Sequence, residues 1–440
     1  MKMTIFEKLK SVYWRNTILS ERQKEQLFYY LRNKIKDKST INKIEDNSKL
    51  NEYVQYILNN QKLNNLFSIK YPEYEKQFLK SSDPKLIAYY LPQFYPNEYN
   101  NKWWGRGSTE WTNVSKAAPQ YVGQYQPRFP GELGYYDLRI QDNIYRQIEL
   151  AKIYGIYGFC FYYYWFDGIR LLDLPFDNYV NDANINFPFF ICWVNESWTK
   201  QWSSSSNTPL IVQNKSVDSY KNFIKSCYGL FLKKNYMKIE DKVILNIYKP
   251  LDIPNPAEVI DYWRNFIFKE LNMELYIIGV VTSFQNYSID YKNIGFDSIA
   301  EFAPGAISHL FKDITKSKEF VCDSFYGKVY DYEEFVNNKK FSNNQLNKLY
   351  RAVIPMWDNT ARKSNKGMIF DGATPELYKH WLKDIIIETK NNKNLDDNII
   401  FINAWNEWAE GAYLEPDLRW QYGYLEATRD AILETRYLED

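Results

Sequence analysis

The chain is 440 residues long, and 45% of its residues are hydrophobic and 25% charged. This length accommodates one large α/β domain with an extension, or two medium-sized domains. The 55 basic and 54 acidic side chains leave a net charge of +1, so no overall field attracts nucleic acid or an anionic membrane. Four widely spaced cysteines and only two histidines argue against a Cys/His zinc site. No run is long enough to span a membrane, and we expect a cytoplasmic protein with reduced thiols.

Residues 1–80 differ in composition from the rest of the chain. Phe6, Leu9, Val12 and Tyr13 recur at helical spacing, and no glycine or proline occurs before Pro72. We predict an α-helical extension over residues 1–80. Two roles are open for it, a spacer packed on the main domain and a docking surface for a membrane face or a partner enzyme.

From residue 84 onward, short apolar runs alternate with longer amphipathic stretches. Several runs are apolar without alternation, as in parallel strands that are covered on both faces. The predicted strands are 85–90, 157–165, 188–194, 242–248, 275–281, 296–300, 351–357 and 398–405. The predicted helices between them include 140–155, 216–234, 256–271 and 374–390. The pattern predicts an α/β fold, a (β/α)8 TIM barrel over residues 84–440. A doubly wound open sheet is the alternative, but neither GxGxxG nor GxxxxGK is present.

Tryptophan, asparagine and carboxylate side chains follow several of the predicted strands. In a barrel of this kind the active site forms at the carboxyl ends of the strands. Sugar rings offer apolar faces to aromatic side chains, and their hydroxyls need planar polar partners, so this mixture indicates a glycan site. A nucleotide site would instead show basic side chains and glycine-rich turns. The predicted substrate-binding residues are Tyr90, Gln93, Trp104, Glu110, Trp111, Tyr163, Trp165, Asn195, Glu196, Trp198, Trp357, Asp358, Asn406 and Trp408.

Glu407 and Glu410 follow the last predicted strand, in the stretch FINAWNEWAEGAYLEP. Glycosidic bond cleavage needs one carboxyl group to protonate the leaving oxygen and a second to act as nucleophile or base. Trp405 and Trp408 beside them are expected to raise the pKa of one glutamate by desolvation, which would separate the two roles. The alternative is structural, with Asn406 as the N-cap of a helix and both glutamates in its first turn.

Five long motifs resemble the WbsX-type proteins of bacterial polysaccharide gene clusters, which are similar to glycoside hydrolase family 99, the endo-α-mannosidases. The motifs are KLIAYYLPQFYP, WWGRGSTEWTNVSKAAPQYVGQYQPRFPGELGYYDL, WVNESWTKQW, MWDNT and FINAWNEWAEGAYLEPD, and the resemblance covers roughly residues 85 to 430. It implies a (β/α)8 barrel that needs no metal and no cofactor. By the same resemblance, Glu407 acts on the sugar 2-hydroxyl, Glu410 is the general acid/base, and configuration is retained through a 1,2-anhydro sugar.

The chain departs from the family pattern in two places. Lys200 and Ser203 stand where the resemblance leads us to expect Arg and Trp-Asp-Gly, and Ala361 stands where Pro is expected. These departures bear on sugar specificity and not on the two glutamates.

We therefore predict a carbohydrate-active enzyme that acts on glycosidic bonds of a bacterial surface polysaccharide, of O-antigen or capsule type, or its precursor. A retaining glycosidase-like mechanism is the first hypothesis, and a glycosyltransferase or transglycosidase in polysaccharide assembly is the alternative. A non-catalytic glycan-binding protein is a further alternative. The expected partners are a free or lipid-linked oligosaccharide, with no nucleic acid. Residues 1–80 would contact polysaccharide-assembly enzymes or the inner face of the membrane if they form a docking surface.

Overall fold

The computed structural model describes residues 55, 79–199, 209–321, 324–343 and 348–436. The chain divides into two compact units, Met1–Lys62 and Leu63–Asp440, and every element described below belongs to the second. The helical extension predicted over residues 1–80 lies outside the described residues, apart from Gln55, Leu79 and Lys80. No helix among the described residues is long and apolar enough to cross a membrane.

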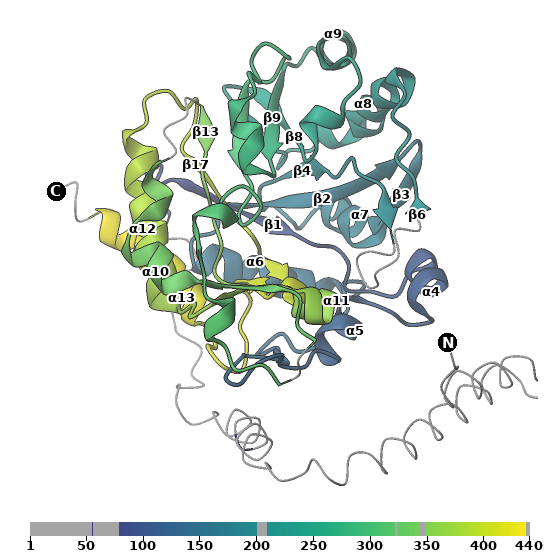
Figure 1. The fold of residues 1–440 in the computed structure, drawn as a ribbon. Helices are drawn as coiled ribbons and strands as arrows, with labels where there is room; N and C mark the ends of the chain where they lie inside the picture. The colour runs from purple at the N-terminus through teal and green to yellow at the C-terminus, as the bar shows by residue number, and fades with distance from the viewer. Residues whose placement is uncertain (1–54, 56–78, 200–208, 322–323, 344–347, 437–440) are drawn as a thin grey trace, which may run out of the picture. The chain divides into compact units, whose positions relative to one another are not determined.

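A ring of parallel strands forms the centre of the second unit (Figure 1). The strands are β1 Lys85–Tyr90, β2 Gly158–Phe166, β4 Phe189–Trp193, β8 Lys242–Ile247, β9 Leu275–Val281, β10 Ser298–Glu301, β13 Leu349–Tyr350, β14 Ala352–Val353 and β17 Ile399–Ile402. Each strand pairs in parallel with its neighbours, from β17 through β1 and β2 to β10. At the two ends of this order, β13 pairs with β10 and β14 pairs with β17. Only Arg351 separates β13 from β14 along the chain, so the two short strands together take the seventh strand position and the barrel is nearly closed. The predicted (β/α)8 barrel is confirmed.

The barrel strands are buried along their length. Every residue of β4 and β9 is buried, as is all of β1 after Lys85. Their near-continuous apolar sequences suit this position, because each strand faces the barrel interior on one side and helices on the other.

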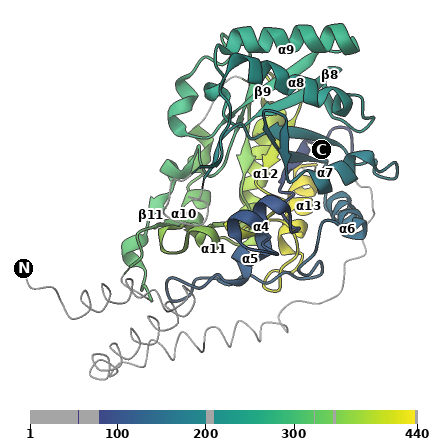
Figure 2. The ribbon, with the colours of Figure 1, turned by 90° about the vertical axis from the view of Figure 1, so that its right-hand side faces the viewer.

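The four predicted helices between strands are all present. They are α6 Gln141–Ile153, α8 Val217–Phe231, α9 Pro256–Leu271 and α12 Pro375–Asn391. Ser216 and Thr374 are the N-caps of α8 and α12, and each side-chain oxygen accepts a hydrogen bond from a backbone N–H in the first turn. Helices α8 and α9 lie side by side, and α12 packs against α10 Tyr332–Asn337 and α13 Gly423–Arg436 (Figures 1 and 2).

The seventh predicted strand, 351–357, is wrong in its extent. The barrel pairing ends at Val353, and Trp357 belongs instead to β15 Trp357–Asp358, which pairs with β16 Met368–Asp371 in a separate four-stranded sheet. Pro355 lies between the two segments and has no N–H to donate to a strand ladder, which accounts for the break.

Several short elements follow the carboxyl ends of the barrel strands and build up that end of the barrel. They are α4 Glu98–Trp104, α5 Glu110–Ser115, β3 Ile169–Leu171, α7 Asp173–Asn181, β5 Trp198–Thr199, β6 Pro209–Ile211, β11 Lys312–Asp313, β12 Lys328–Asp331, α11 Thr360–Lys363, β18 Asn406–Glu407, the 3-10 turn η9 Trp408–Glu410 and β19 Ala412–Tyr413. The short strand β7 Lys238–Ile239 instead precedes β8 and pairs with it.

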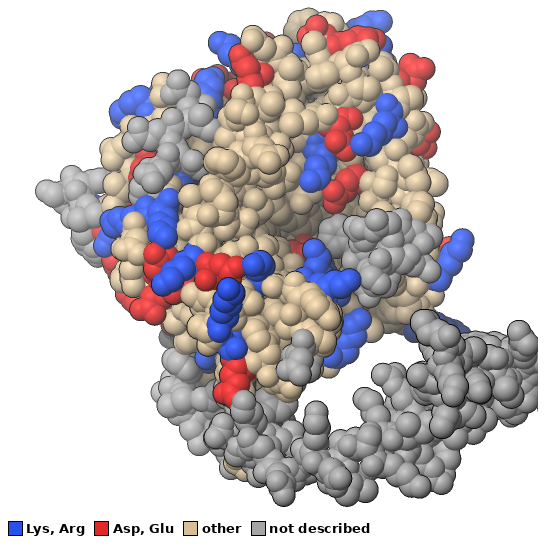
Figure 3. Space-filling model, viewed as in Figure 1, with Lys and Arg blue, Asp and Glu red and all other residues tan. Residues whose placement is uncertain are grey.

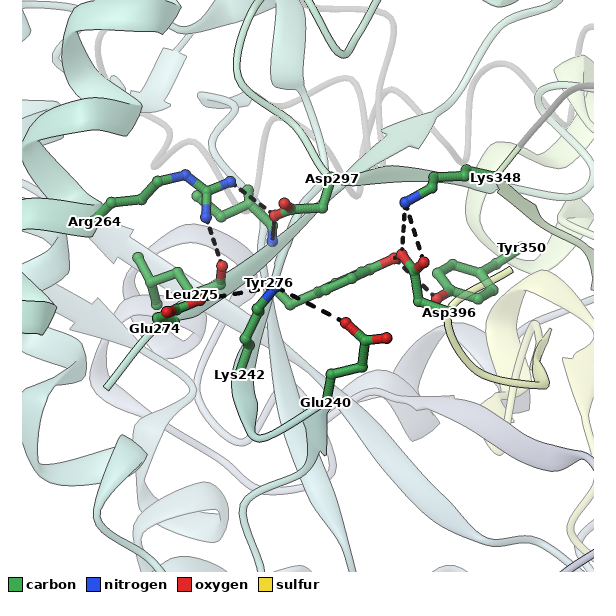
Figure 4. A network of polar contacts seen from close by, with 11 residues as sticks. Glu240, Lys242, Arg264, Glu274, Leu275, Tyr276, Asp297, Lys348, Tyr350 and Asp396 are labelled. Carbon is green, nitrogen blue, oxygen red and sulfur yellow. Dashed lines mark hydrogen bonds and ion pairs between the residues drawn. The ribbon is translucent and has the colours of Figure 1, made fainter. Parts of the chain in front are cut away.

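A polar network links the opposite, amino ends of neighbouring strands (Figure 4). Arg264 on α9 donates to the Leu275 carbonyl at 2.6 Å and to Asp297 at 2.7 Å. The Tyr276 hydroxyl donates to Asp396 at 2.6 Å, and Lys348 donates to the same carboxylate at 2.9 Å. These contacts hold strand starts together on the side away from the candidate site, where a structural role is expected.

Candidate active site

The motif after the last strand forms a tight hairpin. The strands β18 and β19 pair antiparallel, and the turn η9 between them carries Glu410. The Leu91 N–H donates to Asn406 Oδ1 at 2.7 Å, and Asn406 Nδ2 donates to the Leu91 carbonyl at 3.0 Å. This pair of bonds fastens the hairpin to the segment after β1. Asn406 caps no helix, so the predicted alternative with Asn406 as the N-cap is wrong. Glu407 instead occupies the N-cap position of the short 3-10 helix η9, and Glu410 lies in its first turn.

Gly411 allows the hairpin to pack closely against the neighbouring loop. Its φ is +60°, in the left-handed region that favours glycine. A Cβ at this position would lie 2.9 Å from the Asp358 backbone nitrogen and 3.0 Å from the Arg128 guanidinium carbon. The hairpin can therefore present Glu407 and Glu410 from a position that only glycine permits.

Arg362 on α11 binds three carboxylates at once. Its Nη2 donates to Glu110 Oε1 at 2.6 Å and to Glu407 Oε2 at 2.8 Å, and its Nη1 donates to Glu410 Oε1 at 2.8 Å. All four side chains are largely buried, and the most exposed of them, Glu410, is 14% exposed. Each of these bonds takes up a single oxygen of its carboxylate. We call Arg362, Glu110, Glu407 and Glu410 the carboxylate clamp.

Burial favours the protonated forms of both candidate catalytic carboxyls. It raises the pKa of Glu407 to about 8; the charge of Arg362 opposes this rise and that of Glu410 adds to it. Burial also raises the pKa of Glu410, against the charge of Arg362 and with that of Glu110. Near neutral pH the pair is therefore expected to hold a proton, which is the state that acid/base chemistry needs.

The carboxylate clamp lies on a cavity of about 580 Å³ at the carboxyl end of the barrel. Its aromatic lining combines ring faces with polar tips, and consists of Trp103, Trp104, Tyr162, Tyr164, Trp198, Tyr248, Phe302 and Trp357. Near its wall, Lys249 Nζ lies 3.8 Å from Glu196 and donates to the Thr282 hydroxyl at 3.2 Å. The cavity thus offers what a sugar ring requires, apolar faces with charged and hydroxyl groups between them.

Eight of the sixteen predicted site residues line this cavity. They are Gln93, Trp104, Glu110, Glu196, Trp198, Trp357, Glu407 and Glu410. They come from the segments after β1, β4, β14 and β17, so the structure brings together residues that are far apart in the sequence.

Three predicted binding residues point away from the cavity, toward the helices. The Tyr90 hydroxyl donates to Gln147 on α6 at 2.7 Å, and the rings of Tyr163 and Trp165 pack against Phe223 on α8. Side chains alternate along a strand, so their neighbours in sequence face the interior instead. We correct the prediction for Tyr90, Tyr163 and Trp165, which are core residues.

The five remaining predicted binding residues do not line the cavity either, and their side chains bond to other residues of the protein. Asn406 anchors the hairpin, and Asn195 Oδ1 accepts from the Lys249 backbone N–H at 2.8 Å. Asp358 Oδ1 accepts from the Thr360 hydroxyl at 2.6 Å. Trp111 donates to the Tyr136 carbonyl at 2.8 Å, and Trp408 donates to Glu415 at 2.6 Å. We assign these five to positioning and not to substrate contact.

Sequence reasoning missed several lining residues, including Arg362, Tyr162, Tyr164, Tyr248 and Lys249. Alternation along β2 places Tyr162 and Tyr164 on the same face of the strand, but the sequence does not show which face points into the barrel. A cation was also to be expected, since three carboxylates cannot be buried together without one. Lys200 and Ser203, where the chain departs from the family pattern, lie outside the described residues. Ala361 is buried in α11 beside Arg362.

No group of three or more His, Cys, Asp or Glu side chains in the described part of the chain is arranged to hold a metal ion. The cation at the centre of the carboxylate clamp is the guanidinium of Arg362.

Solved structures of other proteins resemble this chain. A solved structure titled "Glycoside hydrolase-like protein" is 14% identical, with a TM-score of 0.52 over 84% of this chain and 99% of that one, which shows the fold. The GH99 endo-alpha-mannosidase from Bacteroides thetaiotaomicron is also 14% identical, with a TM-score of 0.49 over 82% of this chain and 99% of that one.

Among curated proteins, the "Uncharacterized protein WxcX" of Xanthomonas campestris pv. campestris strain B100 is 39% identical over 347 residues. The match covers 79% of this chain and 49% of WxcX, so the chain spans about half the length of the curated relatives that it matches. Residues 86–428 match the family described as Glycosyltransferase WbsX, in agreement with the predicted class of glycan-acting enzymes. The chain belongs to this WbsX family.

Proposed function

We propose that the protein cleaves or transfers at a glycosidic bond of a bacterial surface polysaccharide, of O-antigen or capsule type, or of its lipid-linked precursor. The main support for this proposal is the pair Glu407 and Glu410, which Arg362 binds at the wall of a cavity lined by tryptophan and tyrosine side chains. The WbsX family membership supports the substrate class. The cytoplasm, in contact with the membrane face where such precursors are assembled, is the proposed location.

The proposed chemistry uses one proton shared between two carboxyls. Glu410 donates its proton to the leaving oxygen while ionised Glu407 removes the proton of the sugar 2-hydroxyl. The 2-oxygen then bonds to the anomeric carbon as the bond to the leaving oxygen breaks, which gives a 1,2-anhydro sugar. Water attacks this sugar with Glu410 as base, and Glu407 returns its proton to the 2-oxygen. A raised pKa makes the Glu407 carboxylate a stronger base than an ordinary glutamate, which suits it to a hydroxyl proton.

Transfer follows from the same arrangement if a sugar hydroxyl replaces water in the second step. The WbsX family description, glycosyltransferase, favours this variant. No change in the residues is needed, since Glu410 would take the proton of the acceptor hydroxyl instead of that of water.

Single substitutions separate the two roles. A glycosyl fluoride releases fluoride without needing a proton, so Glu410→Gln is expected to retain its first step while losing activity on natural glycosidic bonds. Glu407→Gln is expected to lose both, because the 2-hydroxyl keeps its proton. Glu333→Gln, an exposed glutamate on α10, is the matched control and should behave as the wild type. Unchanged rates on the natural glycan in both active-site variants would refute the proposal.

The non-catalytic alternative makes a different prediction. A glycan-binding protein would bind fragments tightly without turnover, and titration calorimetry would give the same affinity for wild type, Glu407→Gln and Glu410→Gln. The carboxylate clamp argues against the non-catalytic alternative, because glycan binding alone does not require two buried carboxyls whose pKa values are raised.

A further inference from the structure

Four basic side chains line the cavity, and they fall into two pairs. Arg362 is bound by the carboxylates of the clamp, and Lys249 lies beside Glu196 and bonds to Thr282. The side chains of Lys116 and Lys363 also line the cavity but make no ion pair or hydrogen bond with any residue that the structure describes. Two positive charges are therefore available to a ligand.

Lys116 and Lys363 belong to elements that pack together. Lys116 is the C-cap of α5 and Lys363 is the last residue of α11, and these two helices contact each other and the turn η9 that carries Glu410. In the space-filling view, Lys and Arg side chains gather over α5 and α11 beside the hollow (Figure 3). The charge of Lys363 also lowers the pKa of Glu410, in agreement with this placement.

The two lysines and the clamp give the cavity an internal polarity. With one proton on the Glu407–Glu410 pair, the three carboxylates and Arg362 sum to one negative charge, while Lys116 and Lys363 carry two positive ones. Asn113 and Thr112 line the cavity on the same helix as Lys116 and can add neutral hydrogen bonds. An anionic group is held well by such a set, because hydrogen bonds between ammonium groups and a carboxylate or phosphate are charge-assisted.

We propose that the glycan handled by this site carries an anionic group, a uronic acid carboxylate or a phosphate, that binds to Lys116 and Lys363. The inference rests on the proposed function and adds the chemical class of the substrate. It also orients the substrate, with the anionic group toward α5 and α11 and the reacting bond toward Glu407 and Glu410.

The test is a glycan array that carries neutral, uronic-acid-containing and phosphate-bearing fragments of bacterial polysaccharides. Wild type should be retained on one acidic class, and the class identifies the anion as carboxylate or phosphate. Lys116→Gln/Lys363→Gln should bind that class at least about tenfold more weakly, as expected for two lost charge-assisted contacts. The control Lys366→Gln removes an exposed lysine three residues beyond Lys363 that does not line the cavity, and should bind as the wild type does.

Three results would overturn the proposal: preference of wild type for neutral fragments, no retention on any acidic fragment, or full retention by the double lysine variant. Both lysines are exposed, so thermal unfolding of the double variant should match wild type and exclude loss of fold. Binding needs no turnover, and Glu410→Gln should still show the acidic preference. Failure of the acidic preference therefore leaves the proposed chemistry intact, and failure of the chemistry leaves the binding result intact.

Discussion

Replacement of Arg362 by methionine tests the carboxylate clamp. The substitution keeps a long side chain but removes the only cation that bonds to Glu110, Glu407 and Glu410 among the described residues. Removal of one partner from a buried ion pair typically costs about 3–5 kcal/mol, because the remaining charge has lost its compensation. We expect a loss that approaches this size in the free energy of unfolding at pH 8, where more of the carboxyl charge is present than at pH 5.

The loss should shrink as the pH falls. The pKa of Glu407 is raised from 4.5 to about 8, so this carboxyl binds its proton more tightly in the folded state than in the unfolded state. The free energy of unfolding then decreases as the pH rises from about 4.5 to about 8, in wild type and more steeply in the variant, whose carboxyls lack the opposing charge of Arg362. Protonation at pH 5 should therefore recover part of the lost stability.

Urea denaturation of both proteins at pH 5 and pH 8 measures these differences. Arg139→Met is the matched control, because the Arg139 side chain is 51% exposed and that of its partner Asp137 is 29% exposed. The loss in this variant should stay within about 0.5 kcal/mol. If Arg362→Met is as stable as wild type at pH 8, or if its deficit is the same at both pH values, the reasoning about the clamp is refuted.

Two further predictions concern the hairpin and the parity of β2. Gly411→Ala should destabilise the protein by about 1–3 kcal/mol, because φ is +60° and the new Cβ meets the Asp358 backbone. The control Gly229→Ala places its Cβ in open space inside α8 and should stabilise the protein by up to about 1 kcal/mol. Equal effects of the two variants in thermal unfolding would contradict this account. Tyr163→Ala should lower the stability by about 3–5 kcal/mol, because the Tyr163 ring packs in the core. Tyr164→Ala should lower the stability less but reduce the rate of glycan turnover more, because Tyr164 lines the cavity. A larger stability loss in Tyr164→Ala and a larger rate loss in Tyr163→Ala would show that the two faces of β2 are misassigned.

The barrel was predictable because the almost entirely apolar sequences of its strands indicate burial on both faces. Apolar runs such as 275–281 have no alternation, which distinguishes strands covered on both faces from those of a half-exposed sheet. The helices were equally clear where a capping residue preceded them, as Thr374 precedes α12 and Pro375 begins it. The broken seventh strand shows the limit, since the apolar run continued through Pro355 although the pairing had already ended.

The site was predictable where a residue lies in the segment that follows a barrel strand, as Glu110, Glu196 and Glu407 do. When both faces of a strand are buried, its composition does not reveal which alternate residues face the barrel interior. Tyr163 was therefore predicted and Tyr164 was missed. Arg362 was missed because α11 comes several residues after the seventh strand, and only the fold places it beside the carboxylates.

Incubation of wild type and Glu407→Gln/Glu410→Gln with free and lipid-linked oligosaccharides from the host's own polysaccharide pathway tests the central claim most directly. Products are identified by mass spectrometry and NMR of the anomeric protons. The account predicts shortened or lengthened glycans with wild type and none with the double variant, shortened products indicating hydrolysis and lengthened ones transfer. Equal product formation by the two proteins would contradict the assignment of glycosidic bond chemistry to Glu407 and Glu410.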